Sequence, residues 1–169
     1  MIAHFASKMV AAMPYLIDGH NLIPKIRGMS LREIDDEEQL IELLQAFQRV
    51  KRTKVEVFFD KAPAGQARTK RYGNVTAHFI RQGQPADEAI LQRLHRLAND
   101  ARNWIVVSSD RHVQTQAHAL QAQVISSDDF SLRLEEAFRQ APPGPAGNEG
   151  KLGESEVEEW LKIFKSRKP

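Results

Sequence analysis

Four aspartates stand beside apolar segments, where an ionised carboxylate is costly unless it is paired or bound to a cation. Asp18 closes the run YLI, Asp60 closes VEVFF, Asp110 follows IVVSS, and Asp87 directly precedes an apolar helical pattern. Carboxylate oxygens suit Mg²⁺ or Mn²⁺, which complete their coordination shell with water and substrate phosphate. Such ions activate water and stabilise the leaving oxygen when a phosphodiester bond is cleaved. The four aspartates are therefore candidate metal-binding and catalytic residues of a phosphate-ester hydrolase.

The elements that must position these carboxylates alternate between strand and helix. Apolar runs at 15–18, 55–60, 75–80, 104–109 and 122–127 are typical of strands. Helical spacing of apolar residues follows at 35–50, 85–101, 112–120 and again after residue 128, where Asp128 or Asp129 can cap the helix. This alternation predicts an α/β fold, with a mostly parallel sheet of about five strands and helices on both faces.

That topology predicts where the carboxylates meet. The carboxyl ends of parallel strands lie along one edge of a sheet, which is where open α/β folds bind ligands. Asp18, Asp60 and Asp110 should therefore share this edge. Asp87 lies on the same side of its helix as Ile90, Leu91 and Leu94, so it can also point inward.

Four polar side chains are candidates for a supporting role at this edge. The Asn21 carboxamide can orient a carboxylate or a phosphate, and Ser109 offers a hydroxyl beside Asp110. The Arg111 guanidinium can clamp a phosphate with two hydrogen bonds. Glu88 neighbours Asp87 but is rotated by about 100° around the helix, so it either supports the site or faces solvent.

Positive charge is concentrated in one part of the chain, although the formal net charge is only +2. Between positions 49 and 71 there are eight basic residues and two acidic ones. A polyanionic ligand suits such a local excess. The segment after Asp60, which we predict to be a polar loop on the ligand-binding edge, contributes Lys61, Arg68, Lys70 and Arg71.

Simpler explanations exist for these features. An aspartate that follows a strand is often a turn residue or a helix cap, and a basic loop can be merely solvated. Two other functional classes therefore stay open beside a nuclease. One is a non-catalytic RNA-binding module, and the other is a phosphatase of small esters.

Composition and length exclude several classes of protein. A chain of 169 residues with 41% hydrophobic and 27% charged residues can form one globular domain with a substantial core. It has no cysteine, so disulfides and thiolate metal sites are excluded, and it has no apolar run of about 18 residues that could span a membrane. We expect a cytoplasmic protein without membrane contact.

The chain divides into four predicted parts. Residues 1–13 are an N-terminal extension, 14–140 form the α/β domain, 141–153 are a Pro/Gly-rich linker, and 154–169 form a C-terminal amphipathic helix. The helix carries an apolar stripe of Val157, Trp160, Leu161 and Phe164. We expect this stripe to dock on the domain itself or on a second copy in a homodimer.

Five stretches in order carry a family resemblance: YLIDGHNLI, VEVFFD, PADEAI, VVSSDR, and a small-residue strand ending in SSDDF. Over residues 14 to about 139 the sequence resembles the NYN domains, specifically the YacP-like branch of the PIN-like nuclease superfamily. The resemblance implies a PIN-like three-layer α/β/α sandwich and an endoribonuclease that cleaves RNA with Mg²⁺ or Mn²⁺.

Matched by position, the resemblance places Asp18, Asp60, Asp87 and Asp110 on the family's acidic site. It places Asn21, Glu88, Ser109 and Arg111 on supporting positions. His20 departs from the pattern, because relatives often carry tyrosine there, and the change could alter a packing or base contact.

Overall fold

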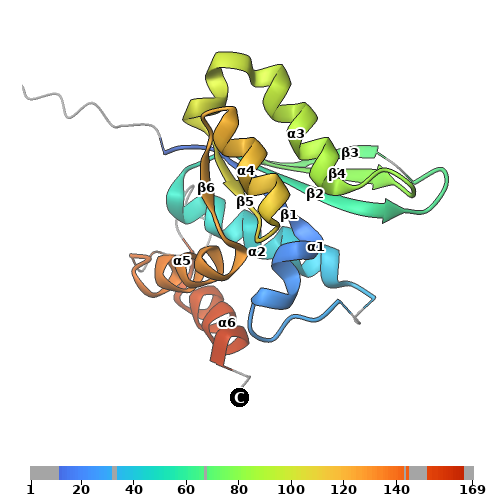
Figure 1. Cartoon of the computed structure of the whole chain (residues 1–169). Coiled ribbons are helices and arrows are strands. Elements are labelled where there is room, and N and C mark those ends of the chain that lie inside the picture. The colour runs from blue at the N-terminus through green and yellow to red at the C-terminus, as the bar shows by residue number, and fades with distance from the viewer. Residues whose placement is uncertain (1–11, 32–33, 67, 143, 145–151, 166–169) are drawn as a thin grey trace, which may run out of the picture.

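A six-stranded sheet forms the centre of the computed structural model, which describes residues 12–31, 34–66, 68–142, 144 and 152–165 (Figure 1). The strands occur in the spatial order β3-β4-β2-β1-β5-β6, and all are parallel except β3, which runs antiparallel to β4. Their bounds are β1 Tyr15–Asp18, β2 Val55–Ala62, β3 Arg68–Tyr72, β4 Val75–Arg81, β5 Ile105–Val107 and β6 Gln123–Ile125.

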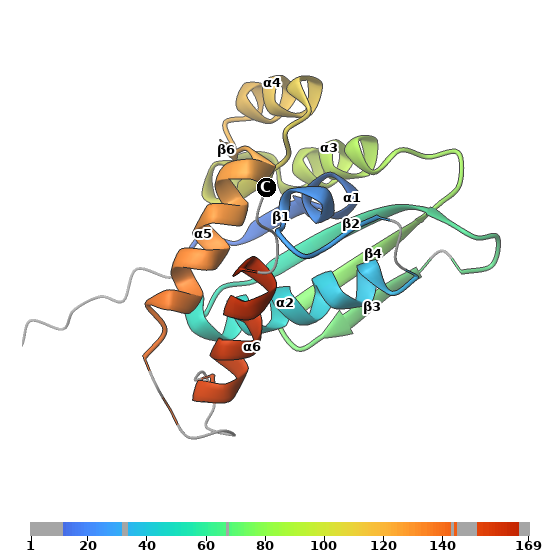
Figure 2. The same ribbon diagram turned by 90° about the horizontal axis from the view of Figure 1, so that it is seen from below.

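Helices cover both faces of the sheet, as Figure 2 shows from below. α2 (Asp36–Lys51), α5 (Ser127–Arg139) and α6 (Glu154–Lys165) pack on one face. α3 (Ala86–Leu97) and α4 (Arg111–Ala119) pack on the other, while the short α1 (Gly19–Leu22) follows β1 directly. Short 3₁₀ segments occupy Ile23–Lys25 and Ala98–Asn103. The predicted three-layer α/β/α sandwich with a mostly parallel sheet is confirmed.

The central strand β1 shows that the sheet is apolar on both faces. Leu16 and Ile17 are fully buried and point to opposite faces, each into its own hydrophobic core. Strands covered on both faces by helices carry such continuous apolar runs. The run ends at Asp18, so the first charged side chain of β1 appears where the strand reaches the edge of the sheet.

The predicted basic loop contains a strand that sequence patterning did not reveal. All of β3 except Tyr72 is exposed, so its sequence RTKRY shows no alternation of apolar and polar residues. A tight turn through Gly73, whose φ is +65°, returns the chain into β4. Charged residues on an edge strand also discourage pairing with another chain, so β3 carries the basic charge on a regular backbone.

The C-terminal helix α6 docks on the α2–α5 face. Phe164 is 1% exposed and lies 6.1 Å from the ring of Phe138, which also stacks against Trp160. Arg49 of α2 forms an ion pair with Glu156. The predicted extension at 1–13 lies outside the described residues apart from positions 12 and 13, and so does most of the predicted linker. Among the described residues, no helix has the length and apolar character needed to cross a membrane.

Candidate active site

Three of the four predicted carboxylates share one electrostatic environment. Asp18 ends β1, Asp60 lies near the end of the adjacent parallel strand β2, and Asp87 lies in the first turn of α3. Burial raises the pKa of Asp18 to about 6, and the negative charges of Asp60 and Asp87 add to this rise. The backbone N–H of Asn21, which donates to Asp18, and the charge on His20 oppose it. Only closely spaced acidic groups repel one another in this way.

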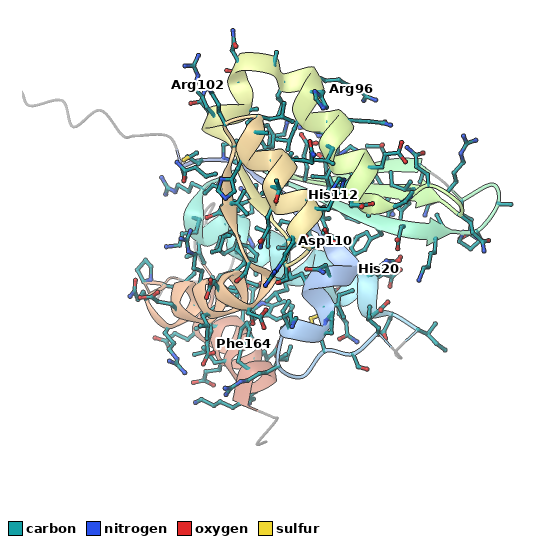
Figure 3. All side chains as sticks on the ribbon, in the orientation of Figure 1. His20, Arg96, Arg102, Asp110, His112 and Phe164 are labelled. Carbon is teal, nitrogen blue, oxygen red and sulfur yellow. The ribbon has the colours of Figure 1, made fainter. Side chains whose placement is uncertain are left out.

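Asp110 lies at the same edge but has a different set of contacts. It follows β5, which pairs with β1, and it is exposed at the start of α4 (Figure 3). Its Oδ1 accepts hydrogen bonds from the backbone N–H groups of His112 and Val113, at 2.8 and 3.1 Å. This carboxylate therefore caps α4, a role that its place after a strand also allows.

His20 links Asp60 to a further acidic residue, Glu37. Its Nδ1 lies 2.6 Å from Asp60 Oδ1, and its Nε2 lies 2.8 Å from Glu37 Oε1 in the first turn of α2. The hydrogen bond to Glu37 raises the pKa of His20, burial lowers it, and the hydrogen bond to Asp60 raises it again, giving about 9. His20 is therefore protonated at neutral pH. Sequence reasoning marked His20 only as a departure from the family pattern and did not single out Glu37.

Gly19 explains how the chain passes so close to β2. A Cβ atom at position 19 would overlap the ring of Phe59 and approach the backbone oxygen of Phe58 to 3.0 Å. A side chain at this position would push α1 away from β2. Glycine therefore allows the contact that brings His20 within reach of Asp60.

Asn21 connects three elements of the site. Its Oδ1 accepts hydrogen bonds from the backbone N–H of Ser109, at 2.8 Å, and from the hydroxyl of Ser127, at 2.6 Å. The Ser109 hydroxyl in turn accepts from the Ser127 N–H at 3.0 Å and donates to Asp128 at 3.3 Å. Asn21 and Ser109 thus fix α1, the end of β5 and the start of α5 relative to one another. The cap of α5 is Ser126, so the prediction of a cap at Asp128 or Asp129 was wrong.

The remaining predicted residues lie on the surface. Glu88 is exposed, with its side chain 3.5 Å from Gln92 one turn later in α3. Arg111 is exposed at the first position of α4. The basic group is also exposed, and two of its members lie over aromatic rings: Arg68 over Phe79, and Lys70 over Tyr72. The exposed basic residues are Lys61 near the end of β2 and Arg68, Lys70 and Arg71 in β3.

Comparison with known proteins assigns the fold to a family. The family model of the YacP-like NYN domain matches residues 15–161. The chain belongs to the YacP-like NYN family. No curated protein resembles the sequence closely enough to count as a match. The family match includes most of α6, so the C-terminal helix lies within the region of similarity rather than beyond it.

Two solved structures of one YacP protein share the fold of this NYN chain. The crystal structure of Rae1 (YacP) from Bacillus subtilis matches with a TM-score of 0.61 and 23% identity, covering 75% of each chain. A tryptophan-to-leucine mutant of the same protein matches with a TM-score of 0.59 and 22% identity, covering 90% of this chain and 92% of that one. These matches support the PIN-like sandwich.

The donor atoms of the NYN domain suit a hard divalent cation. Asp18, Asp60 and Asp87 offer carboxylate oxygens, and the raised pKa of Asp18 reflects negative charge and burial that a bound cation would offset. Within the part of the chain that the structure describes, however, no three acidic or histidine side chains are arranged as a ready metal site. The chemistry of these donor atoms is of the kind that suits Mg²⁺ or Mn²⁺.

Proposed function

We propose that this protein is a metal-dependent endoribonuclease that hydrolyses RNA phosphodiester bonds. The observation that carries the proposal is the position of Asp18 and Asp60 at the carboxyl ends of two neighbouring parallel strands, with Asp87 close enough to contribute to the raised pKa of Asp18. Membership of the YacP-like NYN family supports a nuclease rather than another hydrolase. The exposed cations of β3 and the end of β2 supply a surface for the phosphates of RNA.

Each residue of the site has a distinct role in this proposal. Asp18, Asp60, Asp87 and Asp110 would hold Mg²⁺ or Mn²⁺, and a bound ion would supply an activated water and neutralise charge on the phosphate. Asn21 and Ser109 fix α1 to the end of β5 through their hydrogen bond. Arg111 is free to turn its guanidinium toward a phosphate, and Glu88 adds negative charge at the rim.

Cleavage of a mixed RNA pool tests the proposal. The purified protein is expected to cut RNA internally with Mg²⁺ or Mn²⁺ and to stop when EDTA is added. A non-catalytic RNA-binding module would leave the RNA uncut with either metal. A small-ester phosphatase would hydrolyse p-nitrophenyl phosphate and leave internal RNA linkages uncut. Intact RNA under all metal conditions would overturn the proposal.

The basic residues are expected to bind RNA through phosphates. Replacing Lys61, Arg68, Lys70 and Arg71 together with alanine should weaken binding to all RNA sequences. If each contacts one phosphate, the slope of log K against log salt should fall by about 3, because each single-strand contact contributes roughly 0.7. Filter binding or fluorescence anisotropy between low and moderate salt measures this slope.

A control uses two arginines outside β3. Arg96 and Arg102 are exposed on α3 and on the 3₁₀ segment after it, and Figure 3 labels both. Replacing both with alanine should leave the salt slope within error. Equal slopes for the wild type and the four-residue variant would show that the β3 surface is only solvated.

A further inference from the structure

His20 joins three separate elements through its imidazole ring. The ring comes from α1, one nitrogen contacts Asp60 of β2 and the other contacts Glu37 of α2, at 2.6 and 2.8 Å. The three side chains are only 24–34% exposed. These contacts span 40 and 17 positions of the sequence, so they depend on the folded arrangement of the edge.

The surroundings leave the imidazole little freedom. The ring of Phe59 lies 5.5 Å from it, and Phe59 is itself packed against Gly19. Rotation of the His20 ring would break both carboxylate contacts at once. Because Asp60 Oδ1 is bound to this fixed ring, the orientation of the Asp60 carboxylate is fixed as well.

We propose that His20 and Glu37 are positioning residues that orient the Asp60 carboxylate for cation binding, with Glu37 acting only through His20. The inference rests on the proposed function and deepens it. Outer partners that hydrogen-bond to metal ligands fix their orientation, and losing one typically costs about 10- to 100-fold in metal affinity or activity. Neither residue is predicted to touch the RNA or the reacting phosphate.

The sign of the effect separates positioning from simple blocking. The imidazole Nδ1 occupies Asp60 Oδ1 at 2.6 Å, so removing the ring would free this oxygen and tighten metal binding if the ring only blocked it. Positioning predicts the opposite result, because Asp60 loses its fixed orientation. Glu37 is one residue away from Glu38, which is exposed on the same turn of α2 and serves as a matched control for the loss of one negative charge.

The test is a titration of the full chain with Mn²⁺ alone, followed by calorimetry or electron paramagnetic resonance. His20→Phe keeps an aromatic ring against Phe59 and removes both hydrogen bonds. It should weaken Mn²⁺ binding about 10-fold. Glu37→Gln should weaken it by a smaller factor, and Glu38→Gln should leave it unchanged. Adding Glu37→Gln to His20→Phe should have no further effect, because Glu37 acts through the ring.

A conservative variant provides a rescue. Asparagine can place a donor near the position of the imidazole Nδ1, so His20→Asn should recover part of the affinity that His20→Phe loses. Thermal unfolding of each variant shows whether it is folded at the temperature of the titration. If His20→Phe does not fold, the Glu37 and Glu38 pair still decides the question.

The outcomes separate this inference from the proposed function. Unchanged or tighter Mn²⁺ binding by His20→Phe, with binding abolished by Asp60→Asn, would overturn the positioning role alone. Equal losses for Glu37→Gln and Glu38→Gln would also overturn it, since charge alone would then explain the result. A wild-type protein that binds no Mn²⁺ would overturn the proposed function and this inference with it.

Discussion

Asp18→Asn is expected to abolish RNA cleavage in a protein that remains folded. The substitution keeps the shape of the side chain and removes the charge that attracts a cation. Outer-shell losses cost up to about 100-fold, and Asp18 is proposed as a ligand itself, so the decrease in cleavage rate should exceed about 100-fold. Gel assays with excess Mg²⁺ and Mn²⁺ measure it.

The same substitution should stabilise the metal-free protein. The folded pKa of Asp18, about 6, lies above its ordinary value of 3.8, so the folded state binds this proton more tightly than the unfolded state does. The penalty for ionisation therefore develops as the pH rises from about 4 to 6. It corresponds to a maximum of about 3 kcal/mol. Asp18→Asn should therefore raise the free energy of unfolding by up to this amount at pH 7 and by almost nothing at pH 4.

Urea unfolding in EDTA at the two pH values measures this gain. Asp100→Asn, an exposed aspartate on the segment after α3, is the control and should change stability little at either pH. RNA binding without metal should persist or tighten, because one negative charge near the phosphates is removed. Full RNA cleavage by purified Asp18→Asn, with contaminating nuclease excluded, would refute a metal-holding role for Asp18.

The sheet could be predicted from sequence because burial on both faces leaves a direct signal. β1 and β5 are continuous apolar runs until Asp18 and Ser108, and β2 is interrupted only by Glu56 before it reaches Asp60. β3 gave no such signal, because an exposed edge strand needs no apolar face. It forms because Gly73 turns the chain and β4 offers a free edge for pairing.

The site could be predicted only in part, for a related reason. Topology alone brings Asp18 and Asp60 to one edge, since β1 and β2 are parallel neighbours. It does not determine the partner of each side chain. The ring contacts of His20 and the hydrogen bonds of Asn21 depend on how α1, α2 and α5 pack, which no local pattern records.

Glu56 is a charged residue whose role sequence patterning also missed. It is the second residue of β2, is 3% exposed, and lies on the face covered by α3. Arg93 of α3 forms two hydrogen bonds with its carboxylate, at 2.9 and 3.0 Å, and Lys54 and His78 lie 3.0 and 3.1 Å away. Burial alone would raise the pKa of Glu56, but the hydrogen bonds from these partners outweigh it and hold the pKa well below its ordinary value of 4.5.

Glu56→Gln should lower the free energy of unfolding by about 3 kcal/mol at pH 7. Breaking a buried ion pair from one side typically costs roughly 3–5 kcal/mol, and we expect the lower end because Arg93 keeps some contact with water. Because the folded pKa lies below the unfolded one, this stabilisation exists above about pH 4.5 and is lost as the pH falls further. The difference in unfolding free energy between the variant and the wild type should therefore narrow in urea titrations from pH 6 to pH 3.

The control is Glu135→Gln, which breaks a pair with the exposed Arg139 on α5. It should lower the free energy of unfolding by only about 0.5 kcal/mol. Equal small losses of unfolding free energy in both variants would show that the Glu56 cluster stabilises the fold no more than a surface pair does. A large loss at pH 7 that disappears in acid would identify the Glu56 carboxylate as the group that anchors α3, and with it Asp87, to the sheet.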